Sequence, residues 1–177
     1  SDRLVFVREM LNDPRAKESI TNFHGQWLGF SQMYLNPNYA QDMFQESSAL
    51  VKRIVFEEPQ DWMNIFTLQE TYITPSLSQF YGFGSINQPD WVQYPAGRGS
   101  GILSQGGFAA LGSKFGDTSP TLRGYEVFKR VFCGEFTESV PAIVDINMQP
   151  GTGNECKEEV YTMRNTPACK TCHEITD

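Results

Sequence analysis

The sequence predicts a mainly α-helical protein in which a helical bundle precedes a loop-rich segment that ends in a Cys-x-x-Cys-His motif. Three features of the 177-residue chain predict this organisation. Apolar residues recur at helical spacing over residues 4–81. Gly, Pro, Asn and Ser become frequent from residue 82 onward, and all four cysteines lie after residue 130. We therefore expect a helical domain over residues 1–93 and a loop-rich domain over residues 94–177.

The first half divides into helices at residues that cap or interrupt them. The side chain of Asp13 is suited to cap a helix that begins at Pro14. Proline is tolerated in this first turn because the N–H that it lacks would have no helical partner there. Pro59 closes the long third helix, and Gly82 ends the last one. The expected helices cover residues 4–11, 14–28, 39–58, 61–69 and 75–81.

The third expected helix has a well-defined apolar face. This stripe comprises Met43, Leu50, Val51, Ile54 and Val55. We expect Glu46 and Glu70 to be solvated or capping carboxylates on helices.

Loops dominate the second half of the chain. Residues 82–116 are rich in small and polar residues, and long irregular loops inside a compact domain are uncommon unless they serve a function. A polar cap and Pro120 begin an amphipathic helix that continues to Cys133. The other expected elements are an extended segment over 91–94, a short helix or packed loop over 101–111, a loop over 135–154 and a helix over 155–163.

Composition excludes several classes of protein. With 40% hydrophobic and 13% aromatic residues, the chain is neither disordered nor a disulfide-dense miniprotein. A net charge of -7 argues against a nucleic-acid partner, which would require clustered Lys and Arg. No apolar run is long enough to span a bilayer. No secretory signal opens the chain, and we expect it to be a piece of a longer protein.

Cys169-Lys-Thr-Cys172-His173 is the sequence form of a c-type haem attachment site. On one helical turn the two thiols can reach the vinyl groups along one porphyrin edge, and His173 can bind the iron from the proximal side. We therefore expect one haem c, attached covalently through Cys169 and Cys172. Three alternatives remain open: a redox dithiol without its usual βαβ setting, half of a zinc site whose other half is missing, or a disulfide beside an incidental histidine.

Cys133 and Cys156 are the remaining cysteines. Haem attachment implies assembly outside the cytoplasm, where free thiols oxidise. A Cys133–Cys156 disulfide would close the loop between them and would stabilise the fold by about 3 kcal/mol in the chain-entropy model. Pairing with cysteines outside this chain is the alternative.

Several stretches occur in the same order as in a known family, over almost the whole chain. They are Met10-Leu-Asn-Asp-Pro-Arg15, Phe23-His-Gly-Gln-Trp-Leu-Gly29, Gln79-Phe-Tyr-Gly82, Arg98-Gly-Ser-Gly-Ile-Leu-Ser-Gln105, Thr118-Ser-Pro-Thr-Leu-Arg-Gly124 and His173-Glu-Ile-Thr-Asp177. With them the chain resembles the planctomycete- and myxobacterial-type exported cytochrome c proteins. In these proteins a helical domain of unknown function is followed by a planctomycete cytochrome c domain.

The resemblance implies a cytochrome c-like fold for the loop-rich domain and an extracytoplasmic location, in the periplasm or at the cell surface. It also implies that the chain belongs to a larger exported multidomain protein. Its partners would be a redox protein or other domains of the same parent protein. The physiological role of the family is largely unassigned, so the resemblance implies haem attachment more than any reaction.

Met163 is the expected distal ligand of the haem iron. Family members commonly carry His six positions before the first motif cysteine, where this chain has Met163. Both side chains are good sixth ligands, and Met raises the reduction potential. The alternatives are Met148 in a Pro- and Gly-containing loop, His24 beside Trp27, an open or solvent-bound site, and a Met163 that is simply a core residue.

Arg98 and Arg123 lie in the matching stretches and are suited to bind haem propionates. The alternative is that each ties a loop to a helix end or to a carboxylate. The sequence contains no recognisable nucleophile–base pair or phosphate loop. We therefore expect an electron-transfer domain rather than an enzyme, or alternatively a structural module in which haem is ancillary or absent. A peroxidase-like enzyme would need an open distal side with a polar catalytic residue, which the sequence does not identify.

Overall fold

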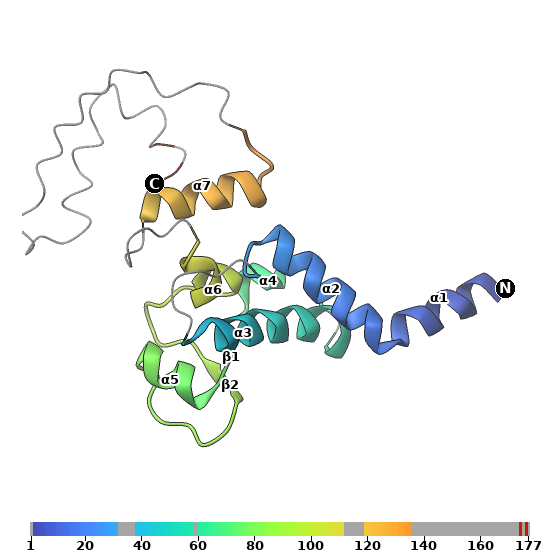
Figure 1. The fold of residues 1–177 in the computed structure, drawn as a ribbon, viewed down its shortest axis with the longest axis horizontal. Helices are drawn as coiled ribbons and strands as arrows, with labels where there is room; N and C mark the ends of the chain where they lie inside the picture. Colours follow the sequence, from blue (N-terminus) through green and yellow to red (C-terminus); the bar gives the residue numbers. More distant parts are fainter. Residues whose placement is uncertain are drawn as a thin grey trace, which may run out of the picture. The chain divides into compact units, whose positions relative to one another are not determined.

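The computed structural model describes residues 2–31, 38–58, 60–111 and 119–135, together with Glu174 and Thr176 (Figure 1). The chain forms two compact units, Ser1–Thr118 and Ser119–Asp177. The described residues are mostly helical, with one two-stranded sheet in the first unit. This confirms the mainly α fold class.

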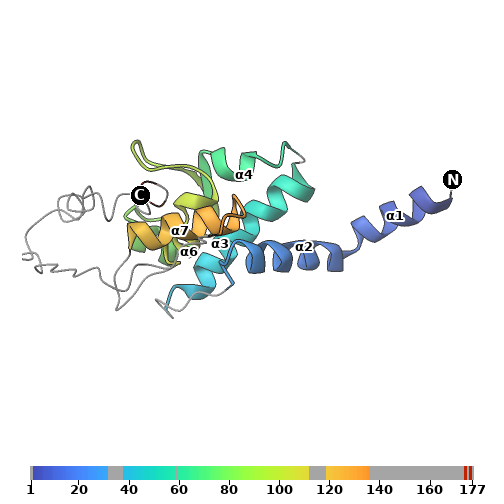
Figure 2. The same cartoon turned by 90° about the horizontal axis from the view of Figure 1, so that it is seen from above.

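Two consecutive helices open the first unit, α1 (Asp2–Asn12) and α2 (Pro14–Trp27). Asp13 separates them as expected, because its side chain accepts a hydrogen bond of 2.9 Å from the Arg15 backbone N–H and so caps α2. Figure 2 shows α1 extending beyond α2, and no residue of α1 is buried. The exposed apolar side chains of α1 are Leu4, Val5, Phe6, Val7, Met10 and Leu11.

α3 (Ala40–Lys52) packs against α2 and against the elements that follow it. The sequence predicted one helix as far as residue 58, whereas α3 continues as a π-helical turn over Arg53–Glu57. In this wider turn the Glu58 N–H donates to the Arg53 carbonyl, five residues earlier. The expected apolar face is confirmed for Met43, Leu50, Val51 and Ile54, which are all buried, whereas Val55 is only half-buried.

A small antiparallel sheet lies beside α3. Its strands are β1 (Glu70–Ile73) and β2 (Asp90–Gln93), with Tyr72 opposite Trp91. β2 confirms the expected extended segment. The helix expected over 61–69 was largely wrong, because only α4 (Asn64–Thr67) is α-helical and the chain then turns into β1.

α5 (Pro75–Tyr81) connects the two strands and matches its expected bounds. The Thr74 hydroxyl accepts a hydrogen bond from the Leu77 N–H, and Gly82 ends the helix in the left-handed conformation at a φ of 73°. After β2, a 3-10 turn (Ile102–Ser104) and the short helix α6 (Gly106–Ala109) complete the first unit.

The core of the first unit includes residues beyond the domain boundary expected at residue 93. Ile102, Phe108 and Leu111 are buried, and α6 packs against α3. Residues from the helical half complete this core: Leu28, Phe30, Leu50, Ile54, Ile65, Ile73 and Leu77. The first compact unit therefore continues to residue 118.

The described part of the second unit consists mainly of α7 (Pro120–Arg130). The Ser119 hydroxyl caps it by accepting from the Leu122 N–H at 3.3 Å, which confirms the predicted helix start. The loop expected over 135–154 and the helix expected over 155–163 lie almost entirely outside the described residues.

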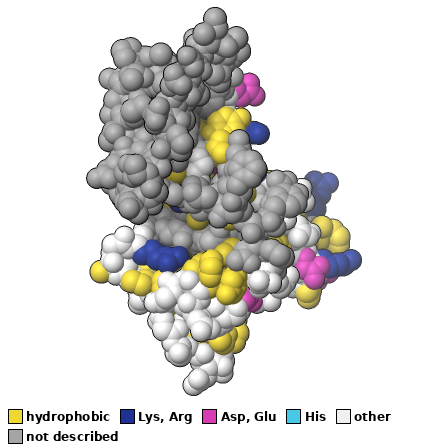
Figure 3. Space-filling view, turned by 60° about the vertical axis from the view of Figure 1, so that its left-hand side comes forward, with side chains coloured by type: hydrophobic (Ala, Val, Ile, Leu, Met, Phe, Trp, Pro, Cys, Tyr) yellow, Lys and Arg dark blue, Asp and Glu magenta, His cyan; other side chains and the backbone are white. Residues whose placement is uncertain are grey.

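The described residues expose both apolar and charged side chains. On the coloured part of the face in Figure 3, hydrophobic side chains are scattered, and charged side chains occur singly or in small groups. Among the described helices, none has the length and hydrophobicity that a bilayer span requires.

Candidate functional site

The residues of the predicted haem site lie outside the described part of the chain. This applies to Cys169, Cys172 and His173, and also to the predicted distal ligand Met163 and its rival Met148. Within the described residues there is no group of three His, Cys, Asp or Glu side chains that could hold a metal ion. Haem attachment and its ligands therefore stay predictions.

His24 has a structural environment. Its Nδ1 lies 2.8 Å from the Ile20 carbonyl oxygen, and its Nε2 accepts a hydrogen bond of 3.1 Å from the Trp62 indole N–H. These contacts require the tautomer in which Nδ1 carries the proton. Trp62 also stacks on Trp27, with ring centroids 5.5 Å apart. Both ring nitrogens of the buried imidazole are thus occupied, so His24 holds α2 to the chain before α4.

Arg98 stacks on two aromatic rings of the first unit. Its guanidinium carbon lies 4.5 Å from the Tyr81 ring centroid and 4.8 Å from that of Phe83. Such cation–π contacts hold the planar guanidinium in a fixed orientation. Arg123 lies on α7 in the other unit and is half-buried. Contact of either arginine with a haem propionate stays a prediction.

Cys133 is exposed, with a φ of 53°, just after α7. Its predicted disulfide partner, Cys156, lies outside the described residues. The Cys133–Cys156 pairing therefore stays a prediction.

A carboxylate network lies at the centre of the first unit. Glu46 is fully buried on α3, and its two oxygens accept hydrogen bonds from the hydroxyls of Thr71 (2.6 Å) and Tyr81 (2.8 Å). The Tyr81 oxygen in turn accepts from the Gly106 backbone N–H at 2.8 Å. Gln105 donates to the Thr71 hydroxyl at 3.4 Å. The network therefore joins α3, β1, α5 and α6.

The expectation of a solvated Glu46 was wrong. Position 46 is three residues after Met43 and four before Leu50, so it lies on the buried face of α3. This helical spacing from Met43 and Leu50 was the signal in the sequence that could have predicted burial. The carboxylate can be buried because distant segments supply the hydroxyl groups that donate to it. Glu70 was also placed wrongly on a helix: it lies on β1 and forms an ion pair of 2.6 Å with Arg53.

Burial raises the pKa of Glu46 to about 7, from an ordinary value of 4.5. The hydrogen bonds from Thr71 and Tyr81 and the positive charge of Arg98 act in the opposite direction but do not cancel the loss of hydration. Burial also raises the pKa of Tyr94 to about 12. Glu46 is thus a buried group that titrates near neutral pH.

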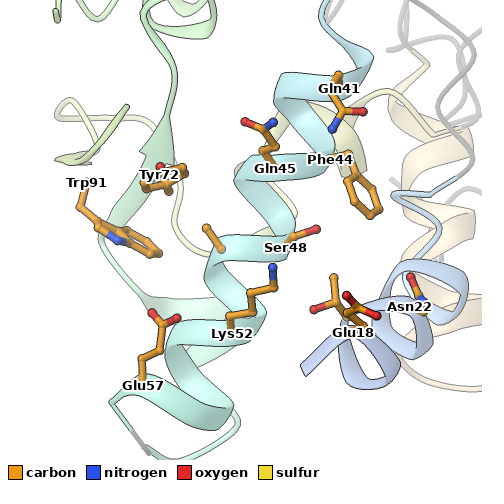
Figure 4. A pocket seen from close by; sticks show the side chains of 12 residues that line it. Glu18, Asn22, Gln41, Phe44, Gln45, Ser48, Lys52, Glu57, Tyr72 and Trp91 are labelled. Atoms are coloured by element: carbon orange, nitrogen blue, oxygen red, sulfur yellow. The ribbon is translucent and has the colours of Figure 1, made fainter. Parts of the chain in front are cut away.

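The first unit also contains an open groove of about 610 Å³ (Figure 4). One face of α3 forms its floor, α2 forms one wall, and the β1–β2 sheet forms the other. The floor carries Gln41, Gln45, Ser48 and Lys52. The walls contribute Glu18 and Asn22 from α2, and Tyr72 and Trp91 from the sheet. This groove could not be recognised in the sequence, because its residues come from four separate segments: α2, α3 with its π-helical turn, β1 and β2.

Comparison with protein families gives two matches. The PSD4 family, described as a protein of unknown function (DUF1592), matches residues 5–83. The PSCyt3 family, also described as a protein of unknown function (DUF1588), matches residues 99–177. These are names of planctomycete cytochrome-associated domains, in agreement with the resemblance found in the sequence. Comparison with curated proteins and with solved structures found no match.

The two matched segments share one core in the structure. Glu46, Thr71 and Tyr81 belong to the PSD4 match, whereas Gln105 and Gly106 belong to the PSCyt3 match. The hydrogen-bond network around Glu46 therefore crosses from one match to the other within the first compact unit.

Proposed function

We propose that this chain carries one covalently attached haem and transfers electrons within a larger exported protein. The observation that carries this proposal is the motif Cys169-Lys-Thr-Cys172-His173, which lies inside the segment matched by PSCyt3. The name of that family points to a cytochrome-related role, although the family is described as one of unknown function.

The donor set of the motif fits a c-type haem. Two thiols at this spacing provide the thioether bonds, and the adjacent imidazole provides a proximal ligand. Bound there, the haem would supply one-electron redox chemistry. In this proposal Cys169 and Cys172 hold the cofactor, His173 binds its iron, and Met163 provides the sixth ligand.

The location and partners follow from the same proposal. Because thioether attachment takes place outside the cytoplasm, the chain would function in the periplasm or at the cell surface. Its net charge of -7 favours a basic redox partner through long-range attraction. Other domains of the parent protein are the second class of partner.

A second candidate function is that of an interaction module in an extracytoplasmic assembly. The exposed apolar side chains of α1 favour it, because large apolar surfaces of this kind commonly lie at protein contacts. In that case haem would be ancillary or absent.

The test is to produce the chain in a host that exports and matures c-type cytochromes, and to measure its intact mass and its reduced optical spectrum. We expect a mass excess of one haem and sharp c-type bands, both lost in a Cys169→Ala/Cys172→Ala double variant. Cys133→Ser is the matched control and should retain both signals. A colourless chain in which Cys169 and Cys172 form a disulfide would eliminate the electron-transfer proposal and leave the interaction module.

A further inference from the structure

The groove over α3 has the size and construction of a ligand site. Its volume of about 610 Å³ lies within the usual range of ligand pockets. Its three sides belong to elements that the core of the first unit holds together, since α3 packs on both α2 and β1. The site therefore does not depend on the position of the second unit.

The floor of the groove includes a row of polar side chains along one face of α3, with Phe44 and Ala49 beside them. Gln41, Gln45, Ser48 and Lys52 follow each other at intervals of four, three and four residues, so they align on one side of the helix. At 1.5 Å per residue this row is about 16 Å long. It would accommodate an elongated ligand better than a single small ring.

The polar groups of the floor are available for a ligand. Gln41 and Gln45 are exposed, and no described residue hydrogen-bonds to either side chain. Ser48 is only 5% exposed, yet its hydroxyl has no hydrogen-bond partner among the described residues. Buried hydroxyls are normally paired, so an unpaired one in the floor of a groove is available to hydrogen-bond a ligand.

The sheet side of the groove supplies aromatic rings. Tyr72 and Trp91 are directly opposite each other across the two strands, with their rings edge to face at 5.7 Å. The Arg53 guanidinium lies 4.3 Å from the Trp91 ring centroid and occupies one face of it. Because Arg53 covers that face, a ligand that stacks on the indole needs the opposite face.

The charges of the groove disfavour an anion. Among the lining residues, Glu18 and Glu57 contribute two carboxylates against the ammonium of Lys52. The nearby Arg53 guanidinium adds no net positive charge, because it is paired with Glu58 and Glu70. A phosphate or sulfate ligand would meet net negative charge there. The amides of Gln41, Gln45 and Asn22 each offer both a donor and acceptors, which is what a neutral ligand rich in hydroxyl groups requires.

We propose that this groove binds a neutral oligosaccharide that lies along α3, with one sugar ring stacked on Trp91. The C–H face of a pyranose ring is apolar and packs on an aromatic ring, while its hydroxyls bind the amides of the floor. Ser48 donates to, or accepts from, one of these hydroxyls. The site is independent of the proposed haem function and would exist in a chain without haem.

The test uses the complete chain and five neutral tetrasaccharides: cellotetraose, xylotetraose, mannotetraose, maltotetraose and tetra-N-acetylchitotetraose. Tryptophan fluorescence and saturation-transfer NMR report binding. We expect saturable binding of at least one of these sugars and at least about a tenfold loss of affinity in Trp91→Ala. Gln45→Ala should weaken binding about fivefold, through the loss of one hydrogen bond.

Two control variants match these substitutions outside the groove. Phe132→Ala removes an exposed aromatic ring outside the groove, and Gln79→Ala removes another exposed helical glutamine. Both should bind as the unchanged chain does. Gln45 is exposed, so Gln45→Ala remains informative even if Trp91→Ala fails to fold. Absence of saturable binding by all five sugars, or binding that neither groove substitution weakens, would overturn the proposal. Stronger binding of a sulfated tetrasaccharide would overturn its claim of a neutral ligand.

Discussion

The Tyr81 hydroxyl donates a hydrogen bond of 2.8 Å to Oε2 of Glu46, a residue 35 positions earlier in the chain. The same Tyr81 oxygen accepts from the backbone N–H of Gly106. One phenol therefore connects the buried face of α3 with the beginning of α6. Because Glu46 lies in the interior, the stability of the first unit depends on how this carboxyl group is charged.

Stability should fall as the pH rises toward neutral. The folded-state pKa of Glu46, about 7, is above its ordinary value of 4.5, so the folded chain binds this proton more tightly than the unfolded chain does. The resulting contribution to the free energy of unfolding is fully present below the unfolded pKa and is lost as the pH rises through the folded pKa. It amounts to about 3 kcal/mol. Urea unfolding at pH 4 and pH 8, followed by circular dichroism, measures this loss.

Glu46→Gln should remove this part of the pH dependence, because an amide does not titrate. Glu9→Gln, on the exposed surface of α1, is the matched control and should leave the profile unchanged. Equal pH profiles for Glu46→Gln and the unchanged chain would show that Glu46 does not titrate in this range.

A fragment of residues 1–93 should not fold cooperatively, whereas a fragment of residues 1–118 should. The shorter fragment lacks Ile102 and Phe108, which are 0% and 2% exposed in the core, and it lacks the Gly106 N–H that binds Tyr81. Thermal unfolding of both fragments, measured by circular dichroism, tests this expectation. A cooperative transition of the 1–93 fragment at the temperature of the longer one would contradict it.

Gly101→Ala should destabilise the first unit by about 2–4 kcal/mol. Gly101 has a φ of 56° and a ψ of -159°, a backbone region open essentially to glycine alone. A Cβ there would also lie 2.3 Å from the Ile65 carbonyl oxygen. Gly84→Ala is the control: its φ is 94° but nothing lies within 4 Å of the added carbon, so backbone strain alone should cost about 1–2 kcal/mol. Chemical denaturation measures both changes. If Gly101→Ala and Gly84→Ala lower the free energy of unfolding equally, the close contact of the added Cβ at position 101 is relieved by a shift of the backbone.

Met163→Ala should abolish the near-infrared charge-transfer band between sulfur and ferric iron, if the haem is attached as proposed. A lost sixth ligand also lowers the reduction potential, which spectroelectrochemical titration measures. Met63→Ala, which changes an exposed methionine of the first unit, should leave both properties unchanged. Survival of the band in Met163→Ala would assign the distal position to another residue, with Met148 the next to replace.

Elements with local end signals were predictable from the sequence. α5 and α7 each begin with a hydroxyl cap followed by proline, at Thr74-Pro75 and Ser119-Pro120, and Gly82 provides the stop for α5. These signals act over a few residues, so neighbouring sequence is sufficient to recognise them.

Features that depend on distant residues were not predictable in the same way. β1 is a strand because Tyr72 pairs with Trp91, which lies beyond an intervening helix. Glu46 is buried because Thr71 and Tyr81 supply hydroxyl donors from later elements. For the same reason the groove on α3 could not be recognised before α2 and the sheet were placed beside it. The spacing of apolar residues identified the buried face of α3. It did not identify which residues of other segments would contact the polar side chains of this helix.

The shared interior of the first unit also limits how the gene can be rearranged. Recombination that joined a PSD4 segment to a different downstream sequence would remove Gln105 and Gly106 from their partners. In the resulting protein, the buried carboxyl group of α3 would lack part of the hydrogen-bond network that surrounds it. We therefore expect the two segments to be retained together in evolution, even though each is recognised as a family of its own.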